Sequence, residues 1–343
     1  MVWPILIAIL FFGLMIFIHE LGHFTVAKLS GIRVNEFAIG MGPKLLSFGK
    51  GETTYSLRLI PMGGYVQMEG EDEASEDERA FNKKPVWKRF LVVLAGAVMN
   101  ILLGLVLVAI LITQQDLVGT TQIAGFYENA SSQASGLQAG DVITHINGTS
   151  VWSDRDISFL MARDKDGVIE FTVERDGKTV DLKNVQFATQ QVEGQTVITF
   201  DFVIIGEPHT IWNVLKTSFL ETASMARLVW LSLFDLVTGR FGLSDLAGPV
   251  GTVSVIAEAT TSGGFLNALS LMAFITVNIG VFNLLPIPGL DGGRLLFLVI
   301  EGIRRKPVNP KREGMIHAIG LVLMFALIAV VTFNDILRLI RGG

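Results

Sequence analysis

The sequence predicts a polytopic α-helical membrane protein with about four transmembrane helices, a membrane-associated β-hairpin and an inserted extracytoplasmic β-rich domain. Three observations predict this class. Half of the 343 residues are apolar and 17% are charged, a balance typical of integral membrane proteins. Four apolar runs are long enough to cross a bilayer. Residues 117–206 form a more polar stretch in which short runs alternate between apolar and polar residues.

The four apolar runs define the predicted membrane spans. Each offers about 20 apolar residues, the length that a hydrocarbon core of roughly 30 Å requires. The first run lacks the basic segment and the small-residue cleavage site of a signal peptide, so we expect a retained helix. The predicted spans are residues 2–27, 90–113, 268–300 and 316–333, within a first membrane region at 1–116 and a last one at 265–343.

Lysine and arginine in short loops predict the orientation, because such loops stay in the cytoplasm. Basic residues gather between the first two spans and again at 304–312, between the last two. Both loops can be cytoplasmic only if residues 211–237 do not cross the membrane, and the domain at 117–206 then lies outside. Segment 211–237 carries spread charges, which suits a helix in the outer interface within a region at 207–264. These charges are Lys216, Glu221, Arg227 and Asp235.

Two hairpins are predicted from turn sequences between alternating runs. Residues 54–68 read as a β-hairpin in the first cytoplasmic loop, because the turn sequence at 61–64 separates two short alternating segments. In the outside domain, Asp176 and Gly177 separate two further alternating runs within 168–182. Asp-Gly at such a position is a strong hairpin signal.

The first span contains His19-Glu20-Leu21-Gly22-His23, an H-E-x-x-H sequence inside an apolar helix. Helical spacing places both imidazoles one turn apart on one face, where they can ligate one zinc ion, with Glu20 as general base. A purely structural reading would need a polar partner in hydrocarbon for each of the three side chains. Because ionisable groups are costly in a span, the sequence favours a hydrolytic zinc site within the membrane.

A catalytic zinc usually has three protein ligands and a water, so the two histidines leave one ligand to find. The chain has no cysteine, which excludes thiolate ligands. Asp291 follows the point where Pro286, Pro288 and nearby glycines break the third span. At about 1.5 Å per residue, His19 and Asp291 both reach the cytoplasmic third of the bilayer and could share one metal. The alternative for Asp291 is a turn or helix-capping carboxylate beside Arg294.

Two asparagines are the other polar groups within the spans. Asn283 stands at the helix break, where its amide could hold a substrate carbonyl or stabilise an oxyanion, so we expect it in the site. Asn100 in the second span is predicted to serve helix packing through an interhelical hydrogen bond. The net charge of −5 argues against a nucleic-acid partner.

Taken together, these motifs resemble the site-2 protease family of intramembrane zinc metalloproteases (peptidase M50), in its bacterial regulator-of-sigma-E protease branch. The matching segments are residues 19–23, 55–68, 80–85, 95–100, 247–251 and 283–293. They cover nearly the whole chain in the family's order. The family usually has proline where Ala97 stands, and some relatives carry two PDZ domains where this chain has room for one at 117–206.

The resemblance implies one zinc per chain, held by His19, His23 and Asp291, with Glu20 as the catalytic base. It implies a PDZ domain at 117–206, whose signature Gly136-Leu137 and Gly140-Asp141 resemble. The hairpin at 55–68 would hold the substrate as an added strand. The substrate-binding residues implied are Asn283, Pro286, Pro288, Gly63, Gly64 and Tyr65.

The resemblance also implies a function. The expected reaction is hydrolysis of peptide bonds in or near transmembrane segments of single-pass proteins, such as anti-sigma factors or remnant signal peptides, during regulated intramembrane proteolysis. The expected location is a bacterial inner membrane with the active site toward the cytoplasm, downstream of a site-1-type protease. Two other classes compete: a membrane-tethered PDZ adaptor with a non-catalytic metal site, and a metal-ion transporter. The transporter would be expected to place several polar residues along more than one span, and the second and fourth spans have few.

Overall fold

The computed structural model describes residues 2–49, 51–71, 73, 75–164, 166–192, 195–239, 248, 251–252 and 264–341. The chain folds into two compact units. The first joins Met1–Leu107 to Leu228–Gly343, and the second is Val108–Arg227. Segment 247–251, one of the matching segments, lies largely outside the described residues.

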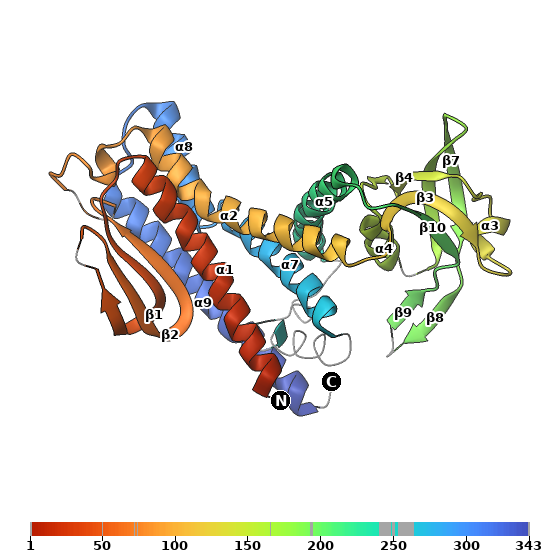
Figure 1. Ribbon diagram of the computed structural model, residues 1–343, viewed down its shortest axis with the longest axis horizontal. Helices are drawn as coiled ribbons and strands as arrows, with labels where there is room; N and C mark the ends of the chain where they lie inside the picture. Colours follow the sequence, from red (N-terminus) through yellow and green to blue (C-terminus); the bar gives the residue numbers. More distant parts are fainter. Residues whose placement is uncertain are drawn as a thin grey trace. The chain divides into compact units, whose positions relative to one another are not determined.

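Four helices of the described chain are long and apolar enough to cross a membrane, by length and composition. They are α1 (Val2–Leu29), α2 (Val86–Thr113), α7 (Gly264–Asn283) and α9 (Pro310–Arg341) (Figure 1). Small residues let α2 approach both α1 and α7 closely: a Cβ on Gly22 would lie 2.5 Å from the Ala95 carbonyl, and one on Gly280 3.0 Å from that of Ala97. This arrangement fits the predicted polytopic membrane protein.

The third span is shorter than the sequence predicted. α7 ends at Asn283, and turns and bends lead through Pro286 and Pro288 to α8 (Asp291–Arg304). The predicted break is therefore confirmed, and the helix in this region that is long and apolar enough to span ends at Asn283, whereas the predicted span ran to residue 300. After the break, Leu295 and Leu298 of α8 are buried in the protein core.

The predicted hairpin at 54–68 is part of a larger sheet. β1 (Val34–Phe48) pairs antiparallel with β2 (Thr54–Met68). The register places Ala38 opposite both Ser56 and Tyr65, so each arm of β2 pairs with β1. On its other side Ser56 pairs with Ser47 of β1, so the first arm of β2 has no free edge with which to pair with the second arm. The prediction that the two arms pair with each other is wrong.

That error arose because no strand was predicted at 34–48. Gly40, Gly42 and Pro43 look like a loop in sequence. In the structure both glycines have positive φ (85° and 83°), yet they bend β1 without ending it.

One buried apolar cluster joins α1, β1, β2, α2 and α8, with the short 3₁₀ helix η1 (Phe81–Lys83) between the sheet and α2. An ion pair adds to it, because Arg89 of α2 lies 2.5 Å from Glu301 of α8 with both side chains largely buried. The cluster therefore holds α8, which begins at Asp291, against α1. Its buried members are Ala27, Ile32, Val34, Phe37, Val66, Met68, Phe81, Val92, Val93, Leu295 and Leu298.

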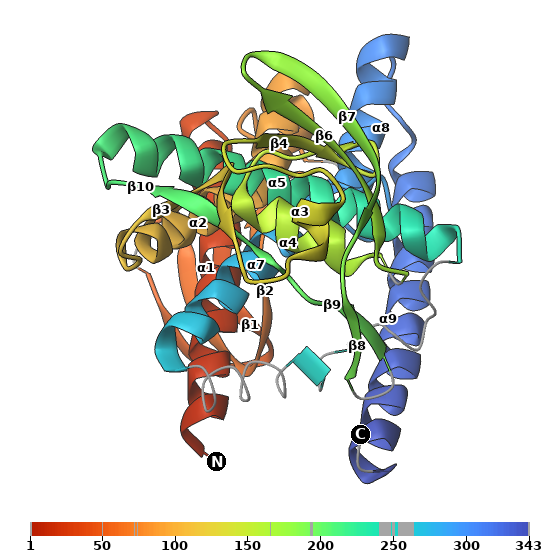
Figure 2. The ribbon, with the colours of Figure 1, turned by 90° about the vertical axis from the view of Figure 1, so that its right-hand side faces the viewer.

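The second unit is built on a six-stranded sheet with the order β10-β3-β4-β6-β7, in which β5 also pairs with β4. Its core lies between the sheet and α4, which contacts β3 and β4, while α3 packs on β7 (Figure 2). A separate pair, β8 and β9, follows β7. The bounds are β3 Val118–Phe126, α3 Ser131–Ala134, β4 Val142–Ile146, β5 Thr149–Ser150, α4 Asp154–Ala162, β6 Val168–Arg175, β7 Lys178–Gln186, β8 Thr189–Val192, β9 Gln195–Ile198 and β10 Phe202–Glu207.

The hairpin predicted around Asp176-Gly177 is confirmed. Arg175 pairs with Lys178 across the turn between β6 and β7. Asp176 and Gly177 both have positive φ, 51° and 72°, the conformation that a two-residue type I′ turn requires.

Segment 211–237 is the helix α5 (Ile211–Val237), and it is not one of the four candidate spans in the described chain. Two of its charged residues meet α4 within the second unit: Glu221 lies 2.7 Å from Arg155, and Arg227 lies 3.0 Å from Asp156. These contacts account for two of the four charges that suggested an interfacial helix. The location of α5 along a membrane stays a prediction.

Candidate metal centre

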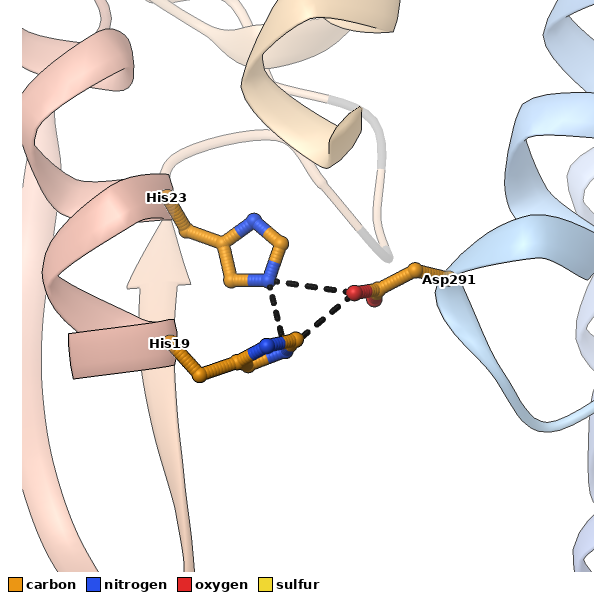
Figure 3. Close-up of side chains that lie close together, drawn as sticks. All are labelled: His19, His23 and Asp291. Carbon is orange, nitrogen blue, oxygen red and sulfur yellow. Dashed lines mark hydrogen bonds and ion pairs between the residues drawn. The ribbon is translucent and has the colours of Figure 1, made fainter. Parts of the chain in front are cut away.

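Three side chains from two helices point toward one another (Figure 3). His19 and His23 lie one turn apart on α1, and Asp291 is the first residue of α8. The two Nε2 atoms are 3.2 Å apart, and Asp291 Oδ2 lies 3.2 Å from His19 Nε2 and 3.4 Å from His23 Nε2. Among the described residues, these three form the one His/Asp/Glu group whose ligand atoms converge closely enough to hold a metal ion.

The three atoms fit one zinc ion. Zinc holds nitrogen and oxygen at about 2.0–2.2 Å in a tetrahedron, so neighbouring ligand atoms lie about 3.3–3.6 Å apart. The separations of 3.2–3.4 Å agree closely with that spacing. Asp291 Oδ2 is buried and accepts no well-formed hydrogen bond from the described residues, as expected of an atom shaped to bind a cation. Two imidazoles and a carboxylate also match the donor set of catalytic zinc sites.

Helix α2 covers the other side of both imidazoles. His23 Nδ1 donates a hydrogen bond to the Val92 carbonyl at 2.8 Å, which leaves Nε2 as the metal-binding nitrogen. One turn on, Gly96 has no side chain, and a Cβ there would overlap His23 Nε2. Another turn on, the amide of Asn100 lies 3.3 Å from His19 Nδ1. The rings are therefore packed between α2 and α8.

Glu20 faces a cavity of about 200 Å³ beside the histidines. The Glu20 side chain is buried, and the backbone of β2 approaches it closely at Gly64. A Cβ on Gly64 would lie 2.9 Å from Glu20 Cγ and 2.9 Å from the Ala38 carbonyl, so only glycine fits there. The cavity is lined by Phe12, Met15, Ile16, His19, Glu20, Gly63, Gly64, Asn100, Ile279 and Asn283.

The structure brings some of the predicted substrate-binding residues to this cavity and others not. Asn283, Gly63 and Gly64 line it. Tyr65 lies outside the lining, with its hydroxyl hydrogen-bonded to Arg58. The prolines also lie outside: Pro286 is exposed in the loop before α8, and Pro288 packs tightly against α9, where a Cβ on Gly320 would overlap it. Their assignment as substrate-binding residues stays a prediction.

Sequence reasoning missed two supports of the histidines. Asn100 does make an interhelical contact, as predicted, but its partner is His19, and it also lines the cavity. A polar residue in an apolar span was the signal that could have assigned it to the site. No sequence signal could have identified the Val92 carbonyl, because every residue has a backbone carbonyl.

Comparisons with known proteins agree with the zinc chemistry that these three ligands indicate. The family model described as Peptidase family M50 matches residues 7–327. The chain belongs to peptidase family M50. RasP of Bacillus subtilis, a regulator of sigma-W protease, is 31% identical to this M50 chain over an alignment of 413 positions, gaps included, which covers 96% of the chain and 97% of the relative.

Two further relatives bear on the cofactor. The zinc metalloprotease RasP of Bacillus licheniformis is 32% identical over an alignment of 421 positions, gaps included, which covers 96% of this chain and 98% of the relative. A protein of Clostridium acetobutylicum, provisionally named a zinc metalloprotease, is 40% identical over 334 residues, with 97% of each covered. This M50 protein is thus a RasP-like zinc metalloprotease, and an adaptor without enzymatic activity is disfavoured.

Proposed function

We propose that this M50 protease hydrolyses peptide bonds in or next to the transmembrane segments of single-pass membrane proteins. The observation that carries the proposal is where the hydrolytic groups lie. His19, Glu20 and His23 belong to α1, one of four helices in the described chain that are apolar enough to cross a bilayer. His19 and Glu20 line a cavity that α7 borders with Ile279 and Asn283. A peptide bond that enters this cavity must come from a segment that tolerates the apolar surroundings.

The residues would act in distinct ways. Zinc, which His19, His23 and Asp291 would hold, would supply Lewis acidity for the scissile carbonyl and the attacking water. Glu20, whose carboxylate faces the cavity, takes the proton from that water and returns it to the departing amine. Asn283, on the cavity wall formed by α7, donates its amide N–H to the carbonyl oxygen as negative charge develops.

The strand next to Glu20 supplies a way to hold the substrate. A helical peptide bond is hydrogen-bonded within its own helix, so a protease must first extend it. Residues 64–68 pair with 34–39 of β1, and no strand of the described chain pairs with their other edge. Since Gly63 and Gly64 line the cavity, an extended substrate added at this edge would pass beside the catalytic groups. The motif resemblance implied that the hairpin at 55–68 holds the substrate as an added strand. Within that segment, residues 64–68 offer the edge for such a strand, and they pair with β1 and not with the other arm of β2.

The proposed substrates are anti-sigma factors or remnant signal peptides, cleaved during regulated intramembrane proteolysis after an upstream protease has trimmed them. The motif resemblance supports this class, as does the name of the Bacillus subtilis relative, a regulator of sigma-W protease. We further propose a bacterial inner membrane, with the metal centre toward the cytoplasm. The basic loops between the spans support that orientation, and the exposed Trp212, Leu215 and Phe219 of α5 would face lipid at the opposite interface.

For the second unit we propose a single PDZ domain at 117–206 that excludes large ectodomains. The residues of the PDZ-like signature support a framework role. Leu137 is fully buried in the core, and buried Asp141 accepts two hydrogen bonds from Arg175, at 2.7 and 2.8 Å. None of the three metal-binding candidates lies in this unit.

The test uses purified protein in lipid nanodiscs and single-pass peptides, with products mapped by mass spectrometry. Glu20→Gln should keep zinc and slow cleavage by at least about 10²-fold, because it removes only the base. Asp291→Ala should lose both zinc and cleavage, because two imidazoles alone hold the ion poorly. Near-normal cleavage by Glu20→Gln would remove Glu20 from the mechanism, and full zinc occupancy in Asp291→Ala would show that the third ligand lies elsewhere.

A further inference from the structure

One face of α2 supports both histidines of the metal centre. Val92, Gly96 and Asn100 recur every four residues, so they stack along that face. The Val92 carbonyl accepts the hydrogen bond from His23 Nδ1, and Gly96 leaves space for both rings. Asn100 stands in the equivalent position toward His19, with 1% of its surface exposed and its amide 3.3 Å from His19 Nδ1.

Counting protons on His19 decides how Asn100 is oriented. His19 Nε2 points at Asp291 and His23, so it is the nitrogen available to zinc. A neutral imidazole that binds metal through Nε2 carries its proton on Nδ1 and is a hydrogen-bond donor there. The amide NH₂ of Asn100 lies nearest to Nδ1 and is also a donor, so the two groups cannot bond in that orientation.

The oxygen of the same amide supplies the solution. Asn100 Oδ1 is buried and has no hydrogen-bond partner in the described part of the chain. The two ends of an amide are nearly the same size, and the hydrogen-bond network decides which end lies where. Turning the amide over brings Oδ1 to Nδ1–H, which removes the clash of donors and gives the buried oxygen its partner.

We infer that Asn100 is a positioning residue of the zinc site, whose amide oxygen accepts the Nδ1–H of His19 and thereby directs Nε2 at the metal. Asn100 acts through His19 and touches neither metal nor substrate in this role. Such outer partners fix the tautomer and the ring orientation of a histidine ligand, and losing one typically weakens metal binding about 10- to 100-fold. The inference rests on the zinc site and holds whatever the substrate is.

Zinc affinity of the full-length protein tests this inference without relying on proteolysis. Affinity is measured by competition with a chromogenic zinc chelator, and the ligand field by the absorption spectrum of the cobalt-substituted protein. Asn100→Leu, which keeps the size and removes the acceptor, should bind zinc about 10- to 100-fold more weakly and change the cobalt spectrum. Asn100→Asp, which keeps an acceptor oxygen, should bind zinc at least as tightly as the parent.

Asn283→Leu is the matched control, because Asn283 lines the same cavity from α7 and makes no hydrogen bond to either histidine among the described contacts. Its zinc affinity should equal that of the parent even though cleavage falls. Unchanged zinc affinity in folded Asn100→Leu would overturn the inference and leave Asn100 a packing residue. Should the leucine variant fail to fold, Asn100→Ala replaces it, and a folded Asn100→Asp that binds zinc more weakly than the parent would equally overturn the inference.

Discussion

The two larger sheets of the molecule use the same apolar–polar alternation for different purposes. In the second unit, Ile143, Ile169 and Phe171 are at most 1% exposed and meet α4 in a closed core. In the β1–β2 sheet, Leu46 and Phe48 are 62% and 67% exposed, while the other end of the sheet packs against α1. The sheet of the second unit is therefore covered by residues of its own unit, whereas the β1–β2 sheet leaves part of its apolar surface exposed.

The difference shows that alternation identifies a half-buried strand but not what covers it. The sheet of the second unit is covered by its own helices. The β1–β2 sheet belongs to a unit with four candidate spans, so its exposed apolar residues suit lipid or an added substrate strand. It also lies directly against the helix that carries Glu20. Substitutions in the two sheets should therefore have unequal effects on catalysis.

The largest difference in cleavage rate is expected when one methyl group is added to each of the two sheets. Gly64→Ala adds a Cβ where Glu20 Cγ and the Ala38 carbonyl are both 2.9 Å away, whereas Gly125→Ala in β3 adds one with no atom within 4 Å. Displacing catalytic groups by about 1 Å can cost about 10²-fold in rate, so we expect a loss of that order for Gly64→Ala and none for Gly125→Ala. Cleavage of one peptide by both variants measures this, with zinc content as control. Equal rates would mean that β2 can yield at Gly64.

A smaller effect is expected on the stability of the β1–β2 sheet when the pH is lowered. Burial alone would raise the pKa of Glu36, but hydrogen bonds from Ser56, Arg58 and Lys44 outweigh it and lower the pKa to about 2. Because the unfolded value is 4.5, this carboxylate stabilises the sheet above pH 4.5, and the contribution is lost as pH falls toward 2.

Hydrogen exchange of the β1–β2 amides, corrected for intrinsic rates, should therefore show protection falling between about pH 4.5 and 2. Glu36→Gln should be less protected at neutral pH and should lose most of this acid dependence. A parental pH profile in the glutamine variant would assign the acid sensitivity to another group.

The smallest effect on the chemistry is expected from removing the sheet of the second unit altogether. Replacing residues 119–205 with a flexible Gly/Ser linker should leave cleavage of a short, pre-trimmed peptide close to that of the full chain, since the metal candidates lie in the first unit. The same deletion should permit some cleavage of an untrimmed substrate. If the variant binds zinc but cannot cut the short peptide, the domain delivers substrate actively and does not act as a filter.

Features that depend on neighbouring residues were readable from the sequence. The spacing of His19, Glu20 and His23 follows from the helical period, and the four spans follow from the cost of polar groups in hydrocarbon. The β6–β7 hairpin follows from the φ preferences of Asp176-Gly177. Each of these is governed by interactions within a few residues.

Features that depend on distant contacts were not. Which partner each arm of β2 takes depends on β1, whose glycines resemble a loop when considered alone. The approach of Asp291 to the histidines was only an argument about depth until packing and the Arg89–Glu301 ion pair held α8 against the other helices. The Val92 carbonyl and the Asn100 amide reach the imidazoles only because small residues let α1 and α2 come close. Helix approach is set by how side chains from remote segments pack, and no local pattern of residues encodes it.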